Sequence, residues 1–458
     1  MALTFIGAAR TVTGSLYLVE YDHQKFLMEC GLYQGHRDEA ERINCTFPFK
    51  PKEIKAVILS HAHLDHSGNL PSLVKRGFEG PVYCTPATTD IASLLLMDSA
   101  RLQENDIAYF NKKQAQHNRP LKEPLYTSAD AETAIRKFMS VNYQTAFEPV
   151  SGVWASLYDA GHILGSSQIV IELGKTRILY SGDLGRKNMP IIKDPARVSD
   201  IDYLIMESTY GSRLHTSFDE MTGELKDLID EGIARGSKII IPAFAVERTQ
   251  LLITMLKDLY TQGTIKDVPV YIDSPLATNV TDVFKRHPEC FDEETYKIFE
   301  RDDPFNFPKL HYTLDTEDSK RLNTMPGSMI IISASGMCEG GRILHHLIHS
   351  ISDPNTIIII TGFQARGTLG RRILDGVSAV QIFNESYDVK AKIHYMSGLS
   401  AHGDSRDLLE YVKVLNSPRL KCVYLVHGDI EESVPLKQKI EELGIKVEIP
   451  QTMQQVAI

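Results

Sequence analysis

Short apolar runs alternate with amphipathic stretches along this chain, and this pattern predicts an α/β protein. Nearly uniform apolar runs predict strands over residues 56–59, 238–242, 268–272, 329–332 and 356–361. The last four are typical of parallel strands that helices cover on both faces. Helical patterns occupy residues 70–75, 249–260 and 342–351.

The length of the chain predicts more than one domain. Its 458 residues exceed the roughly 250–300 at which a single hydrophobic core stops growing. Polar stretches at residues 109–127 and 301–317 predict exposed connections between the regular elements.

Composition is typical of a soluble protein of the cytoplasm. Hydrophobic residues make up 43% and charged residues 24%, which are ordinary values for globular domains. Residues 1–7 predict a strand, because no basic region precedes an apolar core as in a signal peptide. No apolar run approaches the roughly 20 residues that cross a membrane. The six cysteines are scattered without a C-x-x-C pair, which favours reduced thiols and a cytoplasmic location.

Potential metal ligands are concentrated in residues 60–68, directly after the strand predicted at residues 56–59. Three histidines and one aspartate fall within six residues. His61 and His63 share a side if the backbone stays extended. Asp65 and His66 project elsewhere as the chain turns into the next helix. One short segment can therefore serve two adjacent metal ions, and its ligand types suit zinc, with manganese or iron as alternatives.

Two later residues are further candidate ligands. His162 and Asp183 each border a strand-like segment and are flanked by glycines, which allow close backbone approach. Alone, His162 is typical of a loop histidine and Asp183 of a turn former. Together with the first cluster they favour a two-metal site, in which Asp183 is well placed to bridge both cations.

The ordered set His61, His63, Asp65, His66, then His162 and Asp183, resembles the metallo-β-lactamase superfamily. This resemblance implies an αββα sandwich with metals at one edge of its two sheets. The family usually has an aspartate at the end of an early strand, where it steadies a metal-bound histidine. Glu29 takes that position here, with a side chain one methylene longer.

Three further motifs are similar to those of the β-CASP nucleases: residues 206–211 to motif A, 400–404 to motif B, and 426–429 to motif C. The resemblance implies an α/β β-CASP domain inserted at 209–390, between metallo-β-lactamase segments at 1–208 and 391–458. Within the family, the chain resembles the endonuclease subunit of the cleavage and polyadenylation factor and its bacterial and archaeal relatives. Histidine in motif C, here His427, is usual for members that act on RNA.

The resemblance also implies roles for individual residues. His61, His63 and His162 would hold one metal; Asp65, His66 and His427 the other; Asp183 would bridge them. Two Zn²⁺ per chain are expected, with Mn²⁺ as the alternative. The cations would share a hydroxide for in-line attack at phosphorus. His402 would protonate the leaving 3′-oxygen, Glu207 would orient His402, and Asp65 would also orient the nucleophile.

The inserted region carries segments that resemble RNA-contacting segments of this family. Its candidate phosphate-binding residues are Arg248, Ser335, Gly336, Arg366 and Arg371. The alternative is ordinary strand–turn–helix punctuation with the arginines in solvent. The net charge of −10 argues mildly against a nucleic-acid partner, although a local basic groove would suffice. A metal site between two domains would admit single-stranded RNA more easily than a stiff duplex.

The sequence leaves three functions open. The first is a metal-dependent ribonuclease, mainly endonucleolytic, with 5′→3′ exonuclease activity as an addition. The second is a small-molecule thioesterase or lactonase, which the metallo-β-lactamase core alone would permit. The third is a non-catalytic subunit of an RNA-processing complex. The filled ligand positions, Glu207 and His402 favour the first. The oligomeric state stays open, with a homodimer among the alternatives.

Overall fold

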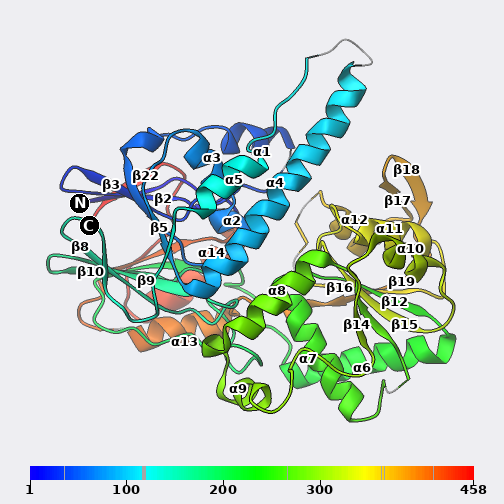
Figure 1. The fold of residues 1–458 in the computed structure, drawn as a ribbon. Helices are drawn as coiled ribbons and strands as arrows, with labels where there is room; N and C mark the ends of the chain where they lie inside the picture. Colours follow the sequence, from blue (N-terminus) through cyan, green and yellow to red (C-terminus); the bar gives the residue numbers. More distant parts are fainter. Residues whose placement is uncertain (36, 116–119, 266, 363, 366, 416) are drawn as a thin grey trace. The chain divides into compact units, whose positions relative to one another are not determined.

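The computed structural model describes residues 1–35, 37–115, 120–265, 267–362, 364–365, 367–415 and 417–458. These residues form two units, which Figure 1 colours along the sequence. Unit 1 comprises Met1–Asn188, Asp194–Leu214 and His402–Ile458, and unit 2 comprises Met189–Lys193 and His215–Ala401.

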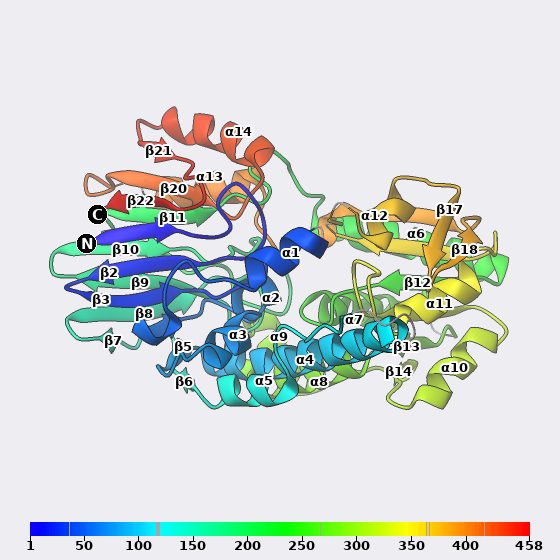
Figure 2. The ribbon, with the colours of Figure 1, turned by 90° about the horizontal axis from the view of Figure 1, so that it is seen from above.

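Unit 1 contains two seven-stranded sheets. The first has the order β22 (Gln454–Ala457), β1 (Ala2–Phe5), β2 (Tyr17–Tyr21), β3 (Gln24–Met28), β4 (Ile54–Ile58), β5 (Val82–Cys84) and β6 (Phe138–Ser140). The second has the order β21 (Val447–Glu448), β20 (Cys422–Val426), β11 (Tyr203–Glu207), β10 (Thr176–Tyr180), β9 (Ser167–Leu173), β8 (Val153–Asp159) and β7 (Phe147–Val150). The two termini lie side by side because β1 pairs antiparallel with β22 (Figures 1 and 2).

The inner faces of these sheets pack against each other. Successive side chains of a strand point to opposite faces, so alternate residues belong to different cores. Phe26 and Met28 of β3 enter the core between the sheets, whereas Leu27 enters the core beneath the helices. Tyr17 and Tyr180 meet across the two sheets with ring centroids 5.3 Å apart.

Helices cover the outer faces of both sheets. Their bounds are α1 (Arg37–Asn44), α2 (Leu64–Ser67), α3 (Leu70–Lys75), α4 (Pro86–Ala115), α5 (Ser128–Ile135), α13 (Ser405–Leu415) and α14 (Ile430–Glu441). Leu70 and Leu73 of α3 share a core with the first sheet. Leu408 of α13 and Leu436 of α14 share one with the second. The order helix, sheet, sheet, helix confirms the predicted αββα sandwich.

Unit 2 is built on a parallel six-stranded sheet. Its order is β14 (Leu310–Tyr312), β13 (Val270–Ile272), β15 (Met329–Ser333), β12 (Lys238–Pro242), β16 (Ile357–Thr361) and β19 (Lys392–Met396). A separate antiparallel hairpin joins β17 (Ala379–Ile382) and β18 (Glu385–Asp388). The helices are α6 (Phe218–Arg235), α7 (Arg248–Thr261), α8 (Pro275–Arg286), α9 (Glu293–Phe299), α10 (Thr316–Thr324), α11 (Ile343–Ser350) and α12 (Leu369–Leu374).

Helices cover both faces of this sheet, as uniformly apolar strands require. Ile240 of β12 shares a core with Leu347 of α11 and Ile373 of α12. On the other face, Ile239 lies so close to Gly232 of α6 that a Cβ at Gly232 would be 2.7 Å from its Cδ1. The parallel α/β architecture predicted for the inserted region is therefore confirmed.

The structure differs from the predicted elements in three places. Helix α4 continues to Ala115 into the predicted connection 109–127, because no glycine or proline interrupts residues 109–115. The connection predicted at 301–317 contains the three-residue edge strand β14, which is too short to show a pattern. Strand β19 pairs with β16, so unit 2 runs to Ala401, beyond residue 390 where the inserted domain was predicted to end.

Of the helices in the described ranges, none combines the length and the apolar character that a bilayer crossing requires.

A buried charge cluster fixes the end of β13. Asp273 is fully buried, and its carboxylate accepts hydrogen bonds from Ser319 Oγ at 2.6 Å and Arg342 Nη1 at 2.7 Å. His346 Nε2 lies 2.6 Å from the same carboxylate. Burial opposes ionisation of Asp273, but these hydrogen bonds outweigh it and lower the pKa of the carboxyl. Its stabilising effect is therefore present at neutral pH and lost as pH falls through the lowered pKa.

We expect Asp273→Asn to destabilise unit 2 by about 3–5 kcal/mol at neutral pH, since breaking a buried ion pair leaves an unpaired charge. Hydrogen exchange of the β13 and β15 amides measures this loss. Asp375→Asn is the matched control, because Asp375 is half exposed and pairs with Arg371 on the helix surface. Equal protection of β13 in both variants would contradict the expectation.

Candidate metal centre

The end of β4 brings the histidine-rich segment to one edge of the first sheet. Asp65 and His66 both lie in the short helix α2, so their side chains leave the backbone in a different direction from those of His61 and His63. Neighbouring backbone holds this turn, because Ser15 N–H donates to the carbonyl of Asp65 and Cys30 N–H to that of His66. The segment can therefore supply two separate groups of ligand atoms.

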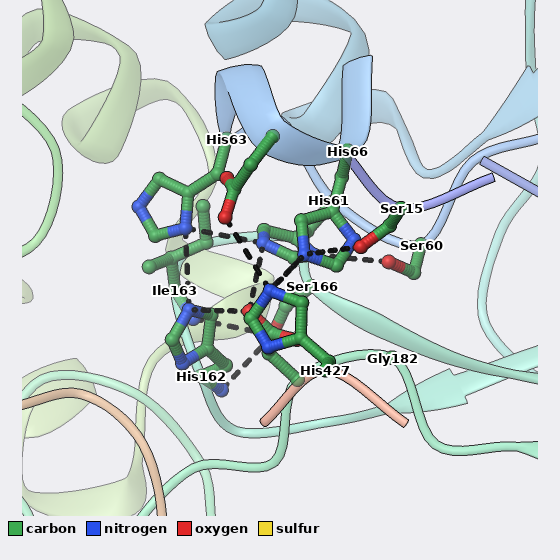
Figure 3. Close-up of polar contacts among 12 residues, drawn as sticks. Ser15, Ser60, His61, His63, His66, His162, Ile163, Ser166, Gly182 and His427 are labelled. Carbon is green, nitrogen blue, oxygen red and sulfur yellow. Dashed lines mark hydrogen bonds and ion pairs between the residues drawn. The ribbon is translucent and has the colours of Figure 1, made fainter. Parts of the chain in front are cut away.

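The first group lies around His63. His63 Nδ1 is 3.1 Å from His61 Nε2 and 3.3 Å from His162 Nε2. Asp183 Oδ2 is 3.5 Å from His61 Nε2 and 3.6 Å from His162 Nε2. All four ligand atoms lie within 4.8 Å of one another. Figure 3 shows how the three histidines of this group face one another.

The second group lies on the other side of Asp183. His66 Nε2 is 3.2 Å from His427 Nε2, which in turn is 3.4 Å from Asp65 Oδ2. Asp183 Oδ2 is also 3.3 Å from His66 Nε2. The structure thus brings together all seven predicted ligand residues, with Asp183 facing both groups.

Protonation differs between the two groups of ligands. Burial opposes protonation of His66, but Asp183 and Glu29 raise its pKa well above the usual value, whereas the histidines of the first group are neutral. Burial lowers the pKa of His61 and His162 well below the usual range, and that of His63 to about 4. These imidazoles are therefore neutral and offer lone pairs. Burial opposes ionisation of Asp183, but the imidazoles of His427, His66 and His402 hold the pKa of its carboxyl well below its usual value. Neutral imidazoles that converge on a carboxylate form a donor set that fits zinc.

Glu29 lies behind the second group. Its side chain is fully buried, and Oε1 accepts a hydrogen bond from Ser60 N–H at 3.0 Å. Its Oε2 lies 3.7 Å from His66 Nδ1, the ring nitrogen that faces away from the other ligands. Burial raises the pKa of Glu29 despite its contact with His66. The longer side chain thus still reaches one of the predicted ligand histidines.

A close backbone approach brings His162 beside Asp183. Gly185 N–H donates to the carbonyl of Ala160, and Gly185 packs directly against Gly161. A Cβ on Gly185 would lie 1.6 Å from the carbonyl oxygen of Gly161 and 2.9 Å from His162 N. The first group of ligands therefore depends on a side chain being absent at this position.

If the metal centre is catalytic, we expect Gly185→Ala to lower the kcat of its reaction by about 100-fold. Displacing a catalytic side chain by about 1 Å has effects of that size. The methyl group must push His162 away from Asp183. Single-turnover rates and zinc content measure the effect. Gly223→Ala is the control, since nothing lies within 4 Å of a Cβ there. Wild-type rates in both variants would refute this role of Gly185.

Glu207 and His402 form a pair next to the ligands. Glu207 ends β11, is fully buried, and accepts hydrogen bonds from Leu184 N–H at 2.7 Å and Thr209 N–H at 3.3 Å. His402 Nδ1 lies 3.1 Å from each of its carboxylate oxygens and 3.9 Å from Asp183 Oδ2. The predicted pair is therefore assembled within unit 1.

The charges around His402 favour its imidazolium form. Burial alone would lower the pKa of His402, but Glu207 and Asp183 raise it to about 9. The side chain keeps 18% of its surface exposed, so it can meet a substrate. A fixed carboxylate behind a protonated, partly exposed imidazole is the arrangement of a general acid.

Two polar contacts of the ligands were not predicted from the sequence. Ser60 Oγ lies 2.9 Å from His61 Nδ1. Thr209 Oγ1 lies 3.1 Å from His427 Nδ1. Serine and threonine next to a metal motif are too common to be noticed alone. A ligand histidine needs a hydrogen-bond partner for its second ring nitrogen, and a search for such partners could have identified these two residues.

The predicted phosphate-binding residues lie in unit 2, except that Arg366 falls outside the described residues. Arg248 begins α7 and donates to the carbonyls of Leu399 and Thr361, each at 3.0 Å. The Ser335 hydroxyl accepts hydrogen bonds from the backbone of the following loop, and Gly336 is buried. Arg371 is exposed and pairs with Asp375 at 2.9 Å. Their binding of phosphate stays a prediction.

Family models match most of the chain. Residues 9–233 match the metallo-β-lactamase superfamily, residues 249–373 the Beta-Casp domain, and residues 386–450 the Zn-dependent metallo-hydrolase RNA specificity domain. The matches follow the order of the motifs and of the two units along the sequence.

Proteins of similar sequence match nearly the whole length of this chain. Ribonuclease TTHA0252 of Thermus thermophilus is 35% identical over 98% of both chains. Two Methanocaldococcus jannaschii proteins are 30% identical: transcription termination factor FttA, over 96% of this chain and 69% of that one, and an RNase J-like protein, over 96% and 95%. A crystal structure of an Enterococcus faecalis protein of unknown function shares the fold, with a TM-score of 0.56 and 14% identity over 100% of this chain and 99% of that one. With the ligand geometry, these matches show that the chain belongs to the β-CASP family within the metallo-β-lactamase superfamily.

Proposed function

We propose that this protein is a metal-dependent ribonuclease that hydrolyses phosphodiester bonds of single-stranded RNA. The observation that carries the proposal is the placement of Glu207 and His402 beside Asp183, with His402 Nδ1 3.9 Å from Asp183 Oδ2. A simple ester or lactone hydrolase needs the metal ligands but no added acid for a poor leaving group. The acid is what phosphodiester hydrolysis requires.

Two Zn²⁺ ions are the cofactors that the ligand set suits best, with Mn²⁺ as the alternative. His61, His63 and His162 would hold one ion, Asp65, His66 and His427 the other, and Asp183 would contact both. When bound, the ions would supply a nucleophilic water at neutral pH and stabilise the negative charge that develops at phosphorus. Glu29 would orient His66.

His402 would complete the reaction by protonating the leaving group. Water attacks phosphorus and releases one proton to solvent, the bond from phosphorus to the ribose 3′-oxygen breaks, and His402 gives that oxygen a proton from Nε2. The products are a 3′-hydroxyl and a 5′-phosphate. Glu207 keeps the ring in place through Nδ1 and favours the protonated imidazole. Asp65 would help to orient the attacking water.

RNA is the substrate that the relatives support. Part of unit 2 and the following motif C region matches the RNA specificity domain, and two similar proteins carry ribonuclease names. We propose internal cleavage as the main activity and 5′→3′ degradation as an additional one. Arg248, Ser335, Gly336, Arg366 and Arg371 would contact the RNA backbone.

The free cysteines indicate a reducing compartment, and we propose that the protein is cytoplasmic. Cys84 and Cys338 are buried free thiols, and burial raises the pKa of each to about 12. Such thiols stay protonated and unreactive at cellular pH.

A matched pair of substrates tests the proposed function. Zinc-loaded protein should cut a single-stranded RNA and leave 5′-phosphate ends, while a chromogenic thioester stays intact. The same RNA with one central 2′-deoxynucleotide should still be cut at that position, because water rather than the 2′-hydroxyl attacks. Thioester hydrolysis without RNA cleavage would replace this proposal by the small-molecule alternative.

We expect Glu207→Gln to shift the alkaline limb of the kcat–pH profile to lower pH. The neutral amide no longer favours the imidazolium, so the pKa of His402 falls. Since His402 acts while protonated, activity disappears as pH rises through that pKa. Single-turnover rates between pH 6 and 10 measure the shift, and an unchanged alkaline limb would show that Glu207 does not tune His402.

A further inference from the structure

The ring of His427 can face the ligands in two ways. Its Nε2 lies 3.2 Å from His66 Nε2 and 3.4 Å from Asp65 Oδ2. Its Nδ1 lies 3.5 Å from Asp183 Oδ1, and a third possible ligand group contains Asp183, His402 and His427. Either nitrogen could therefore offer its lone pair to a cation. The choice depends on which of them carries the proton.

Thr209 decides between the two nitrogens. Its side chain is buried, with 8% of the residue exposed, and it follows the end of β11. The hydroxyl donates its single proton to the backbone carbonyl of His427 at 3.0 Å. The same oxygen lies 3.1 Å from His427 Nδ1, so toward this nitrogen it can only accept. His427 Nδ1 must then carry a hydrogen, which leaves the lone pair on Nε2.

Backbone hydrogen bonds hold the main chain of His427 in place. His427 has a positive φ of 45°, and its N–H donates to the carbonyl of Ala8 at 2.7 Å. Ser208 N–H donates to the carbonyl of His427 at 3.2 Å, next to the bond from Thr209. The main chain thus holds the ring in position, and the threonine hydroxyl sets its tautomer.

We propose that Thr209 is a positioning residue that directs His427 Nε2 toward Asp65 and His66 and so completes the second cation site. Together with Glu207, it makes the end of β11 support two functional histidines, His402 and His427. The inference rests on the proposed function only in that the site holds divalent cations. It does not depend on RNA being the substrate.

Zinc titration of the full chain tests the proposal without any RNA. Thr209→Val replaces the hydroxyl by a methyl group of the same shape, and Thr209→Ser retains the hydroxyl. We expect valine to weaken the second zinc by 10–100-fold, the usual effect of losing a hydrogen-bond partner of a ligand histidine, and to leave the first unchanged. Serine should restore the affinity. Ser433→Ala removes a nearby buried hydroxyl, 2.8 Å from Ser208 Oγ, that contacts no ligand, and should match the wild type.

Three results would overturn the proposal. Thr209→Val could bind both zinc ions as tightly as the wild type, or it could bind both more weakly to the same extent. Thr209→Ser could bind the second zinc as weakly as Thr209→Val does. If the valine variant does not fold, the tautomer of His427 is measured in the wild-type protein instead. Long-range ¹H–¹⁵N spectra of the zinc-loaded protein with labelled histidine should show a protonated His427 Nδ1 and a metal-bound Nε2. The opposite assignment would overturn it. Zinc affinities and spectra are independent of cleavage, so failure of the ribonuclease assay would leave this test valid.

Discussion

Replacing His402 by alanine should lower the single-turnover rate of RNA cleavage by about 10²–10⁴-fold, the range for losing a general acid. The 3′-oxygen is a poor leaving group, and His402 is the partly exposed imidazole whose pKa, about 9, keeps it protonated at neutral pH. Gel analysis of a labelled RNA measures the rate.

Metal content and RNA affinity should stay unchanged in His402→Ala, because the seven ligand residues do not include His402. His23→Ala is the control, since His23 is an exposed histidine in the turn between β2 and β3. A wild-type cleavage rate in His402→Ala would remove the general acid from the proposed mechanism. Loss of zinc together with activity would instead assign His402 to metal binding.

Replacing Asp183 by asparagine should abolish cleavage and weaken the binding of both cations by more than about 100-fold. Loss of a residue that merely orients a ligand weakens a metal by 10–100-fold, so loss of the shared carboxylate should exceed that. Asp183 Oδ2 lies 3.3–3.6 Å from His66, His61 and His162, so it reaches ligands of both groups.

Elemental analysis after dialysis, together with zinc titration, measures this effect. Asp200→Asn is the control, because Asp200 is exposed and asparagine tolerates its positive φ of 58°. Retention of two zinc ions by Asp183→Asn would contradict the bridging role. Loss of only one ion would assign Asp183 to a single site.

The ligands could be predicted because their chemistry leaves a pattern in the sequence. His61, His63, Asp65 and His66 crowd into six residues for no evident structural reason, and His162 and Asp183 stand between glycines. Gly185 shows why the glycines matter, since the segments carrying His162 and Asp183 touch there through their backbones. Through its resemblance to the metallo-β-lactamase superfamily, the order of these six residues predicted the sandwich and their convergence, and the resemblance of motif C added His427.

Contacts between distant segments could not be predicted in the same way. Thr209 and His427 are 218 positions apart, and nothing in the residues around Thr209 marks it as a partner. Strand β14 has three residues and is defined by its pairing with β13 rather than by its own pattern. Helix α4 extends to Ala115 because a polar segment without glycine or proline can continue a helix into solvent. The first two depend on tertiary structure that a local pattern does not contain, whereas the polar composition of residues 109–115 did not distinguish an exposed helix from a loop.

The most direct test of the central claim is cleavage of a 5′-labelled single-stranded RNA by the purified chain. Zinc-loaded protein should release internal fragments with 5′-phosphate ends, chelation should stop cleavage, and added zinc should restore it. His402→Ala, with the same zinc content, should leave the RNA largely intact. If wild-type protein with two bound zinc ions left the RNA whole, or if cleavage continued unchanged in the chelator, the account of a metal-dependent ribonuclease would be wrong.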